Sequence, residues 1–321
     1  MRAIVAALAI LSSSPALAGE PLVLESTIAL PDTAGRIDHL AVDVARKHLI
    51  VAELGNGSVD VVDLASGKVI HRIAKLDAPQ GVVYAPKTDL LAVASDGDGT
   101  VRFYTGADFA PRGVVQLGDD ADNMRLGPGE GQIAVGYGTG GLAILDSAGQ
   151  REFRAITLPD HPEGFQLAPG ADRAFVNVPD AGELAVLDLK AGKEIAHWAP
   201  PRLSQNFPMT LGPSGTLASV YRGQAKLAVF DIAKGDIAAS ADTCGDADDV
   251  FFDAKRGRYY VSCGAGWIDV FAAQDLKRMA HIPTAWGART SLFVPELDRY
   301  YVAERAGLIG SNAAIRVYRP E

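Results

Sequence analysis

The sequence has little cysteine, few aromatic residues and no excess of positive charge. Only two cysteines occur in 321 residues, Phe, Trp and Tyr make up 7% of the chain, and the formal net charge is −9. An acidic surface repels phosphate backbones and anionic lipid headgroups, so nucleic acid and membrane surfaces are poor partners. The chain also lacks a nucleophile elbow, a phosphate loop, a dinucleotide-binding motif and a C-x-x-C-H haem motif. The enzyme classes that carry those local motifs are therefore not indicated.

Long hydrophobic runs are absent, apart from one at the N-terminus. Arg2 precedes an apolar stretch at 4–11, and a small-x-small tripeptide follows at 16–18. This order is typical of a secretory signal peptide, and the stretch is shorter than the roughly 20 apolar residues that span a bilayer. We predict a cleaved bacterial signal peptide at 1–18 and one mature domain at 19–321, with a buried N-terminal helix as the alternative. Since no lipobox cysteine is present, we expect a periplasmic or secreted protein without membrane insertion.

Internal repetition organises the remaining sequence. A unit of four short strands recurs, and its turn prolines are Pro86, Pro128, Pro169, Pro213 and Pro295. Their spacings are 42, 41, 44 and 82 residues, the last being two periods. Four short strands at such a period are typical of β-propeller blades. The second strand of each unit is a nearly continuous apolar run, which indicates a strand covered on both faces by neighbouring blades.

Seven units predict an all-β fold, a seven-bladed β-propeller of four-stranded antiparallel blades. The inner strands are expected to begin near Asp38, Gln80, Asp122, Glu163, Phe207, Asp248 and Arg289. The last unit ends with its third strand at 315–318, and the segment 22–30 resembles the outer strand at 68–76. We therefore predict that 22–30 completes the seventh blade. Closing the ring with both termini would remove two exposed sheet edges.

One stretch of the first unit resembles a known family. The segment 51–70, VAELGNGSVDVVDLASGKVI, is similar to the repeat of YVTN-type propellers, the YncE-like group. The resemblance extends over the mature chain and implies the propeller fold and an extracytoplasmic setting. It implies little about chemistry, because propellers include lyases, lactonases, oxidoreductase subunits and pure binding platforms.

A ring of polar residues precedes the inner strands, at positions that converge on one mouth of a propeller's central channel. Six of the seven units place a carboxylate or carboxamide there, and the seventh places an arginine. The candidate ligand-binding residues are Asp38, His39, Asp122, Asn123, His161, Glu163, Asn206, Asp248, Asp249 and Arg289. The structural alternative is that Asp and Asn merely cap turns by bonding to backbone amides. Because carboxylates aimed at one axis repel one another, we expect a cation, a cationic ligand or the arginine among them.

The first functional hypothesis is a monomeric binding protein. Its acidic pocket would hold a small ligand, a cation or a protein partner at the mouth of the channel. Ca²⁺ or Mg²⁺ is the expected cation, since both take carboxylate and carboxamide oxygens. The candidate metal ligands are Asp122, Glu163, Asn206 and Asp248.

The second hypothesis is an enzyme, either a metal-dependent lactonase-like hydrolase or a lyase. The catalytic candidates are His39, Glu163, Asp249 and Arg289. Carboxylates and histidine can act as general acids and bases, the arginine can hold an anionic substrate, and a metal can activate water. In residue types the ring is loosely similar to the metal site of gluconolactonase-type propellers. No motif matches, so that comparison assigns no catalytic roles.

The two cysteines are predicted to form a disulfide. Cys244 lies in the loop before the sixth inner strand, and Cys263 ends the next strand, so both reach one face of the propeller. The bond would close a loop of about 20 residues, stabilise the fold by roughly 3 kcal/mol and fix part of the polar ring at 245–249. Two buried free thiols are the alternative.

Overall fold

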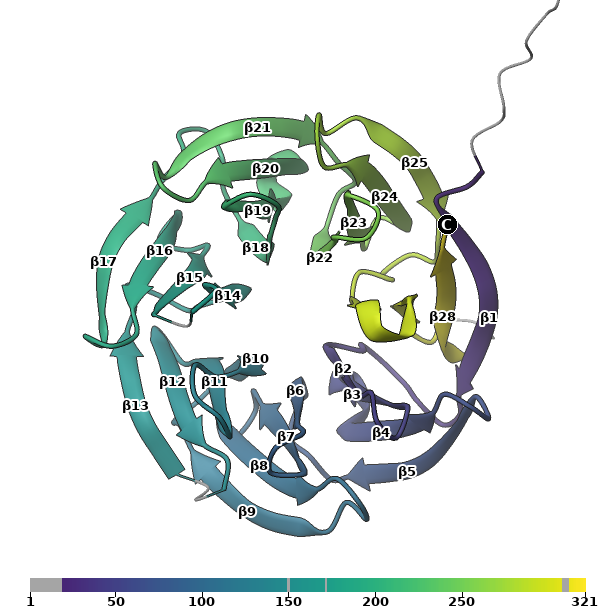
Figure 1. The fold of residues 1–321 in the computed structure, drawn as a ribbon. Helices are drawn as coiled ribbons and strands as arrows, with labels where there is room; N and C mark the ends of the chain where they lie inside the picture. The colour runs from purple at the N-terminus through teal and green to yellow at the C-terminus, as the bar shows by residue number, and fades with distance from the viewer. Residues whose placement is uncertain (1–18, 149–150, 171, 308–311) are drawn as a thin grey trace, which may run out of the picture.

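Seven four-stranded antiparallel sheets stand around a central channel in the computed structural model (Figure 1). The structure describes residues 19–148, 151–170, 172–307 and 312–321. The predicted all-β, seven-bladed propeller is therefore confirmed. The signal peptide predicted at 1–18 lies outside the described residues. In the described ranges no helix combines the length and the apolar character that a membrane crossing requires.

The blades follow one another along the chain. The first three consist of β2 (Leu40–Asp43), β3 (His48–Glu53), β4 (Ser58–Asp63) and β5 (Lys68–Ala74); β6 (Pro79–Ala85), β7 (Leu90–Ser95), β8 (Thr100–Thr105) and β9 (Pro111–Gln116); and β10 (Ala121–Leu126), β11 (Gln132–Tyr137), β12 (Gly141–Asp146) and β13 (Arg151–Thr157). The next three consist of β14 (Phe165–Leu167), β15 (Arg173–Val178), β16 (Glu183–Asp188) and β17 (Lys193–Trp198); β18 (Asn206–Leu211), β19 (Thr216–Tyr221), β20 (Lys226–Asp231) and β21 (Asp236–Asp242); and β22 (Ala247–Asp253), β23 (Arg258–Cys263), β24 (Trp267–Ala272) and β25 (Arg278–Pro283). Blade seven consists of β26 (Ser291–Val294), β27 (Arg299–Glu304), β28 (Ala313–Pro320) and β1 (Leu22–Leu30). Single 3₁₀ turns follow three of these strands: η1 (Leu54–Asn56), η2 (Arg222–Gln224) and η3 (Pro295–Leu297).

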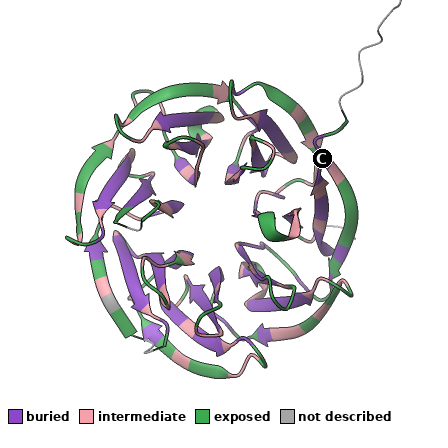
Figure 2. Cartoon of the chain, in the orientation of Figure 1, coloured by how far each residue is buried: buried purple, intermediate pink, exposed green. Residues whose placement is uncertain are grey.

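The core is a ring of interfaces between neighbouring blades (Figure 2). Strand β7 is buried at all of its positions, whereas β21 on the rim is exposed at nearly all of its positions. Phe103 of blade two and Ile133 of blade three belong to one buried cluster, and each has no exposed surface. Continuous apolar second strands therefore arise because both sheet faces meet another blade.

The N-terminal strand closes the ring, as predicted. Strand β1 pairs antiparallel with β28, in a register that runs from Leu22 opposite Pro320 to Leu30 opposite Ala313. Past its end, the Glu321 amide donates to the Pro21 carbonyl at 3.1 Å. Arg258 of blade six donates to the carbonyl of Glu321 at 2.7 Å. Both termini are thus fixed to the body, and β1 covers the edge of β28 that would otherwise be unpaired.

Irregular pairing marks the start of several inner strands. In β10 the pairing shifts between Ala121 and Met124, and in β22 it shifts between Ala247 and Asp249. Strands β6 and β18 shift at the equivalent places. An extra residue in one strand bends it and redirects its side chains. These bulges lie at the predicted polar ring, so they determine which ring side chains face the channel.

The inner strands approach one another closely at this level. A side chain on Gly81 would overlap the carbonyl oxygen of Asp122 in the next blade. Glycine is required there because no other residue lets the two backbones come this close.

Candidate functional site

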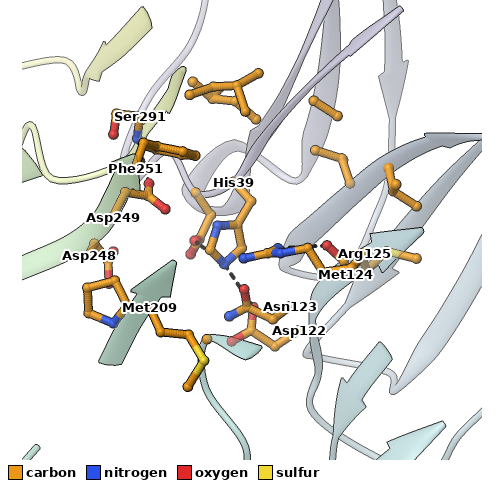
Figure 3. A pocket seen from close by; sticks show the side chains of 18 of the residues that line it. His39, Asp122, Asn123, Met124, Arg125, Met209, Asp248, Asp249, Phe251 and Ser291 are labelled. Atoms are coloured by element: carbon orange, nitrogen blue, oxygen red, sulfur yellow. Dashed lines mark hydrogen bonds and ion pairs between the residues drawn. The ribbon is translucent and has the colours of Figure 1, made fainter. Parts of the chain in front are cut away.

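A cavity of about 480 Å³ lies on the propeller axis and is lined by the inner strands of all seven blades. Seven of the ten predicted ligand-binding residues line it: Asp38, His39, Asp122, Asn123, Glu163, Asp248 and Asp249. Figure 3 shows several of them around the central His39 ring. Towards the other end the wall becomes apolar, with side chains such as Val82, Met209 and Leu292. The cavity therefore combines a charged mouth with an apolar interior, a common design for sites that bind small molecules.

His39 lies between two buried carboxylates. Its Nε2 is 3.7 Å from Oδ1 of Asp38 and 3.6 Å from Oδ1 of Asp122. Burial alone would lower the pKa of His39, but its interactions with these two carboxylates outweigh burial and raise the pKa to about 9. His39 is therefore an imidazolium near neutral pH, which suits an acid or a fixed cation and not a general base.

Asp38 and Asp122 differ in their other contacts. Asp38 also pairs with Arg36 at 2.7 Å, although burial still raises its pKa. For Asp122, burial is outweighed by the interaction with His39, which lowers its pKa. Asp122 is 6% exposed, and its Oδ1 accepts no hydrogen bond from any described residue. Because 3.6 Å is too long for a strong hydrogen bond, Asp122 offers an ionised oxygen that can take another ligand.

Three potential metal ligands converge beside this oxygen. One ligand atom each of Asp122, His161 and Glu163 lies within 4.8 Å of the other two. Nδ1 of His161 lies 2.7 Å from the Gly138 carbonyl and 3.2 Å from Oδ2 of Asp120, so it carries the hydrogen and leaves the lone pair of Nε2 for a ligand. We call these three residues the axial cluster. It joins blade three to the segment leading into blade four.

Glu163 is the least compensated member of the axial cluster. Among the residues that the structure describes, none forms a hydrogen bond or ion pair with its carboxylate. Burial and the nearby negative charge of Asp122 raise its pKa to about 8. A carboxyl group that is partly neutral at pH 7 for this reason can be ionised by a cation or can itself deliver a proton.

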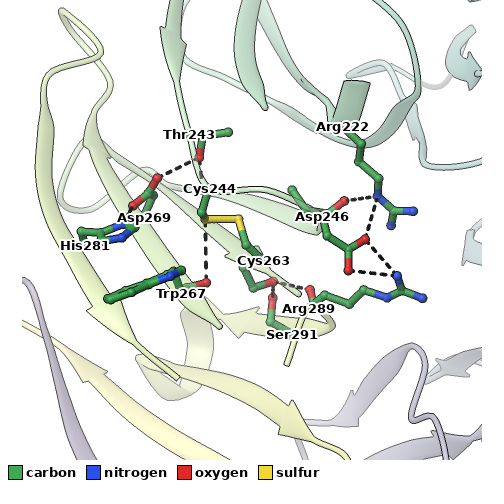
Figure 4. The surroundings of a disulfide bond; sticks show 12 residues. Arg222, Thr243, Cys244, Asp246, Cys263, Trp267, Asp269, His281, Arg289 and Ser291 are labelled. Carbon is green, nitrogen blue, oxygen red and sulfur yellow. Dashed lines mark hydrogen bonds and ion pairs between the residues drawn. A yellow bond between two sulfur atoms is a disulfide. The ribbon is translucent and has the colours of Figure 1, made fainter. Parts of the chain in front are cut away.

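Asp248 occupies a different environment, because two arginines neutralise it. It contacts the guanidinium of Arg222, and its Oδ2 lies 3.0 Å from Nε of Arg289. Asp246 joins the same group at 3.0 Å from Arg289 (Figure 4). Arg222 also stacks over the ring of Phe207, with 3.7 Å between its Cζ and the ring centre. Two carboxylates and two guanidinium groups thus balance one another at the mouth.

His161, Asn206 and Arg289 do not line the axial cavity, although His161 contributes to the axial cluster beside it. Nδ2 of Asn206 donates to Oδ1 of Asn177 and to the carbonyl of Glu183, both at 2.8 Å, between two blades. Arg289 lines a smaller cavity of about 80 Å³ next to Trp286. The structure thus brings Asp122 and Glu163 together as potential metal ligands, and it places Asn206 and Asp248 in other networks.

Asp249 is the remaining carboxylate of the cavity. Its Oδ2 accepts a hydrogen bond from the Ser291 backbone amide at 2.6 Å, which fixes the side chain. Burial raises its pKa to about 6, against the opposing charge of His39. Asp249 therefore titrates close to neutral pH inside the cavity.

The predicted disulfide between Cys244 and Cys263 is confirmed, with 5.8 Å between the two Cα atoms (Figure 4). Cys263 pairs across the blade with Ala247, one residue before Asp248. The bond therefore holds the start of β22, and with it one side of the charged mouth.

Three arginines of the site were not predicted from the sequence. Arg36 and Arg125 line the cavity, and Arg222 reaches it from η2, the turn after a second strand. The position of Arg222 in the sequence indicates that it lies near the mouth, because the second strands of the blades end at the face where the inner strands begin. Arg125 lies two residues beyond Asn123 in the inner strand, but the bulge between Ala121 and Met124 breaks the alternation of β10, so the sequence does not show that its side chain faces the cavity.

Comparison with known proteins identifies a fold and no family. No protein-family profile matches this chain, and no curated protein sequence matches it. A solved structure that is similar is the hydrazine synthase of Kuenenia stuttgartiensis, with 15% sequence identity and a TM-score of 0.75. That match covers 87% of this chain and 94% of the other. At such low identity the likeness supports the propeller fold alone.

Proposed function

We propose that this chain is an exported propeller that binds a small ligand in the axial cavity, and that the axial cluster holds its positively charged part. A divalent cation is the primary candidate. The observation that carries the proposal is the convergence of Asp122, His161 and Glu163, whose ligand atoms lie within 4.8 Å of one another. The buried Oδ1 of Asp122, which accepts no hydrogen bond in the described part, supports it independently.

The chemistry of these donors fits a small cation with mixed oxygen and nitrogen ligands. Carboxylates suit Mg²⁺, Ca²⁺ and Mn²⁺, and an imidazole nitrogen extends the range towards Zn²⁺. A cation would also relieve the mutual repulsion that keeps Glu163 partly protonated. Binding would release that proton, since a carboxylate must be ionised to coordinate a metal.

Export rests on two features. The disulfide is compatible with an oxidising compartment, where such bonds persist. The signal peptide predicted at 1–18 also indicates export. Membership of the YncE-like group, a monomeric state and a small molecule or protein as partner are parts of the same proposal. Recovery of a mature chain that begins at Gly19 from the periplasm or the medium would support export, and retention of residues 1–18 in the cytoplasm would contradict it.

A second candidate function is metal-assisted hydrolysis or a lyase reaction in the same cavity. The observation that favours it is Asp249, whose carboxyl has a pKa of about 6, together with the His39 imidazolium. A base and an acid that titrate on opposite sides of neutrality can move protons during catalysis. Hydrolysis of small lactones, dependent on added metal and lost in Asp249→Asn, would establish this function; a metal-loaded protein without turnover would leave binding alone.

The binding proposal is tested with the exported protein after treatment with a chelator. Mn²⁺, Mg²⁺, Ca²⁺ and Zn²⁺ are titrated separately by calorimetry, and thermal unfolding is followed with and without each ion. A bound ion at 100 times its Kd stabilises the native state by about 2.7 kcal/mol, which raises the unfolding temperature. If none of the four ions binds or shifts the transition, the cation site does not exist.

A further inference from the structure

Arg125 is a cation within the axial cavity that the proposed cation site does not use. It lies on β10, and its side chain lines the same cavity as His39 (Figure 3). Its guanidinium donates to the neighbouring Met124 carbonyl at 2.7 Å. It also lies over the ring of Phe165, with 5.5 Å between its Cζ and the ring centre. Over the described ranges, no carboxylate oxygen lies within ion-pair distance of this guanidinium.

The other arginines around the cavity are all paired. Arg36 contacts Asp38 at 2.7 Å, Arg222 contacts Asp248, and Arg289 lies 3.0 Å from both Asp246 and Asp248. Arg125 is different because burial lowers its pKa, and the nearest influences that favour its charge act only over longer distances. A guanidinium in such a place is incompletely satisfied, since it has five N–H donors and a fixed forked geometry.

The surroundings of Arg125 indicate which kind of ligand could accept hydrogen bonds from its unused N–H groups. The facing walls carry Met209, Phe251 and Leu292. A carboxylate matches the fork of a guanidinium, and an apolar body matches these walls.

We propose that Arg125 binds the carboxylate of a small organic acid whose apolar or aromatic body lies against Met209, Phe251 and Leu292. This inference rests on the proposed function in one respect, namely that the axial cavity is the ligand site. It adds the chemical class of the ligand: an anion at the inner level, below a cation at the mouth. A charge-assisted, two-pronged contact of this kind is worth about 10- to 100-fold in affinity.

The test compares benzoate with benzamide, which has the same shape and no charge. Both are titrated by calorimetry into the exported protein and into Arg125→Met, Arg125→Lys and Arg112→Met. Arg112 is an exposed arginine of outer strand β9 and serves as the matched control. We expect wild type to bind benzoate at least 10-fold more tightly than benzamide, with this preference lost in Arg125→Met, partly kept in Arg125→Lys and unchanged in Arg112→Met.

Equal affinity for benzoate and benzamide, an unaltered preference in Arg125→Met, or no benzoate binding up to about 50 mM would each overturn the inference. Arg125→Lys keeps the test valid if Arg125→Met does not fold. Mn²⁺ titration of the same proteins separates the two proposals. Benzoate binding without Mn²⁺ binding would refute the cation site alone, and Mn²⁺ binding without benzoate binding would refute the role of Arg125 alone.

Discussion

Two clusters in this propeller each bring two carboxylates and one histidine within 4.8 Å of one another, and their surroundings differ. The axial cluster is Asp122, His161 and Glu163. A second set on the rim of blade four, Glu183, Glu194 and His197, also places three ligand atoms within 4.8 Å of one another. We call it the rim cluster. Its histidine side chain is 59% exposed, whereas the His161 side chain of the axial cluster is 20% exposed.

The comparison shows that proximity alone does not make a site. The rim cluster lies within one blade, on the paired strands β16 and β17, and its histidine is exposed to water although the Glu183 side chain is only 14% exposed. Each histidine has an ion-pair partner, Glu194 at 3.3 Å for His197 and Asp120 at 3.2 Å for His161. The axial cluster joins two segments of the ring, with Asp122 buried and its other two members partly buried. Burial and the charge of Asp122 raise the pKa of Glu163 to about 8, so the axial cluster gains more from a cation than the rim cluster does.

The largest expected effect concerns the frame around the axial cavity. Replacing both cysteines, as in Cys244→Ser with Cys263→Ser, should cost about 3 kcal/mol of unfolding free energy, because the unfolded chain regains the freedom of the closed loop. Denaturant unfolding of the double variant and of wild type measures this loss of unfolding free energy. A double variant as stable as wild type would show that the disulfide does not support the mouth.

The next effect separates the two clusters directly. Glu163→Gln should weaken Mn²⁺ binding about 100-fold, because a buried charged ligand is lost, whereas Glu194→Gln should change it less than 2-fold. Calorimetric titration gives the Mn²⁺ dissociation constant of each variant relative to wild type. Equal losses in the two variants would mean that the ion binds elsewhere or that the rim cluster contributes.

The smallest effect is the dependence of stability on pH. The pKa of Glu163 in the folded protein, about 8, lies above its ordinary value of 4.5, so the folded state holds a proton that the unfolded state releases. The contribution of Glu163 to the free energy of unfolding is therefore largest below about pH 4.5, and it is lost as the pH rises through 8. Relative to wild type, Glu163→Gln should therefore become more stable as pH rises across that interval.

The control for this pH effect is again the rim cluster. Glu194→Gln should follow the wild-type unfolding curve in thermal melts at each pH. A difference between wild type and Glu163→Gln that stays constant from pH 4.5 to 8 would contradict the raised pKa.

Most of the architecture was predictable because it depends on repetition. The turn prolines gave the period, the apolar second strands gave the packing between blades, and the unmatched segment 22–30 gave the closure. The disulfide followed from the placement of Cys244 and Cys263 on one face. Each of these inferences needs only the positions of residues along strands.

The arrangement of the site was harder to predict because it depends on side-chain direction. Asn206 lies one residue before the position equivalent to Asp122, because it pairs with Tyr221 as Ala121 pairs with Tyr137, and its side chain bonds between blades. Asp248 is neutralised by Arg222, which comes from the preceding blade and has no fixed spacing to it in sequence. Arg125 is recognisable only once the face of β10 that lines the cavity is known.

The most direct test of the central claim is to locate a bound ion. Crystals of the exported protein soaked in Mn²⁺ should give an anomalous scattering peak within about 2.3 Å of oxygen or nitrogen atoms of Asp122, His161 and Glu163. The rim cluster should show no peak at the same concentration. A peak only at Glu183, Glu194 and His197, or no peak on the axis, would contradict the account.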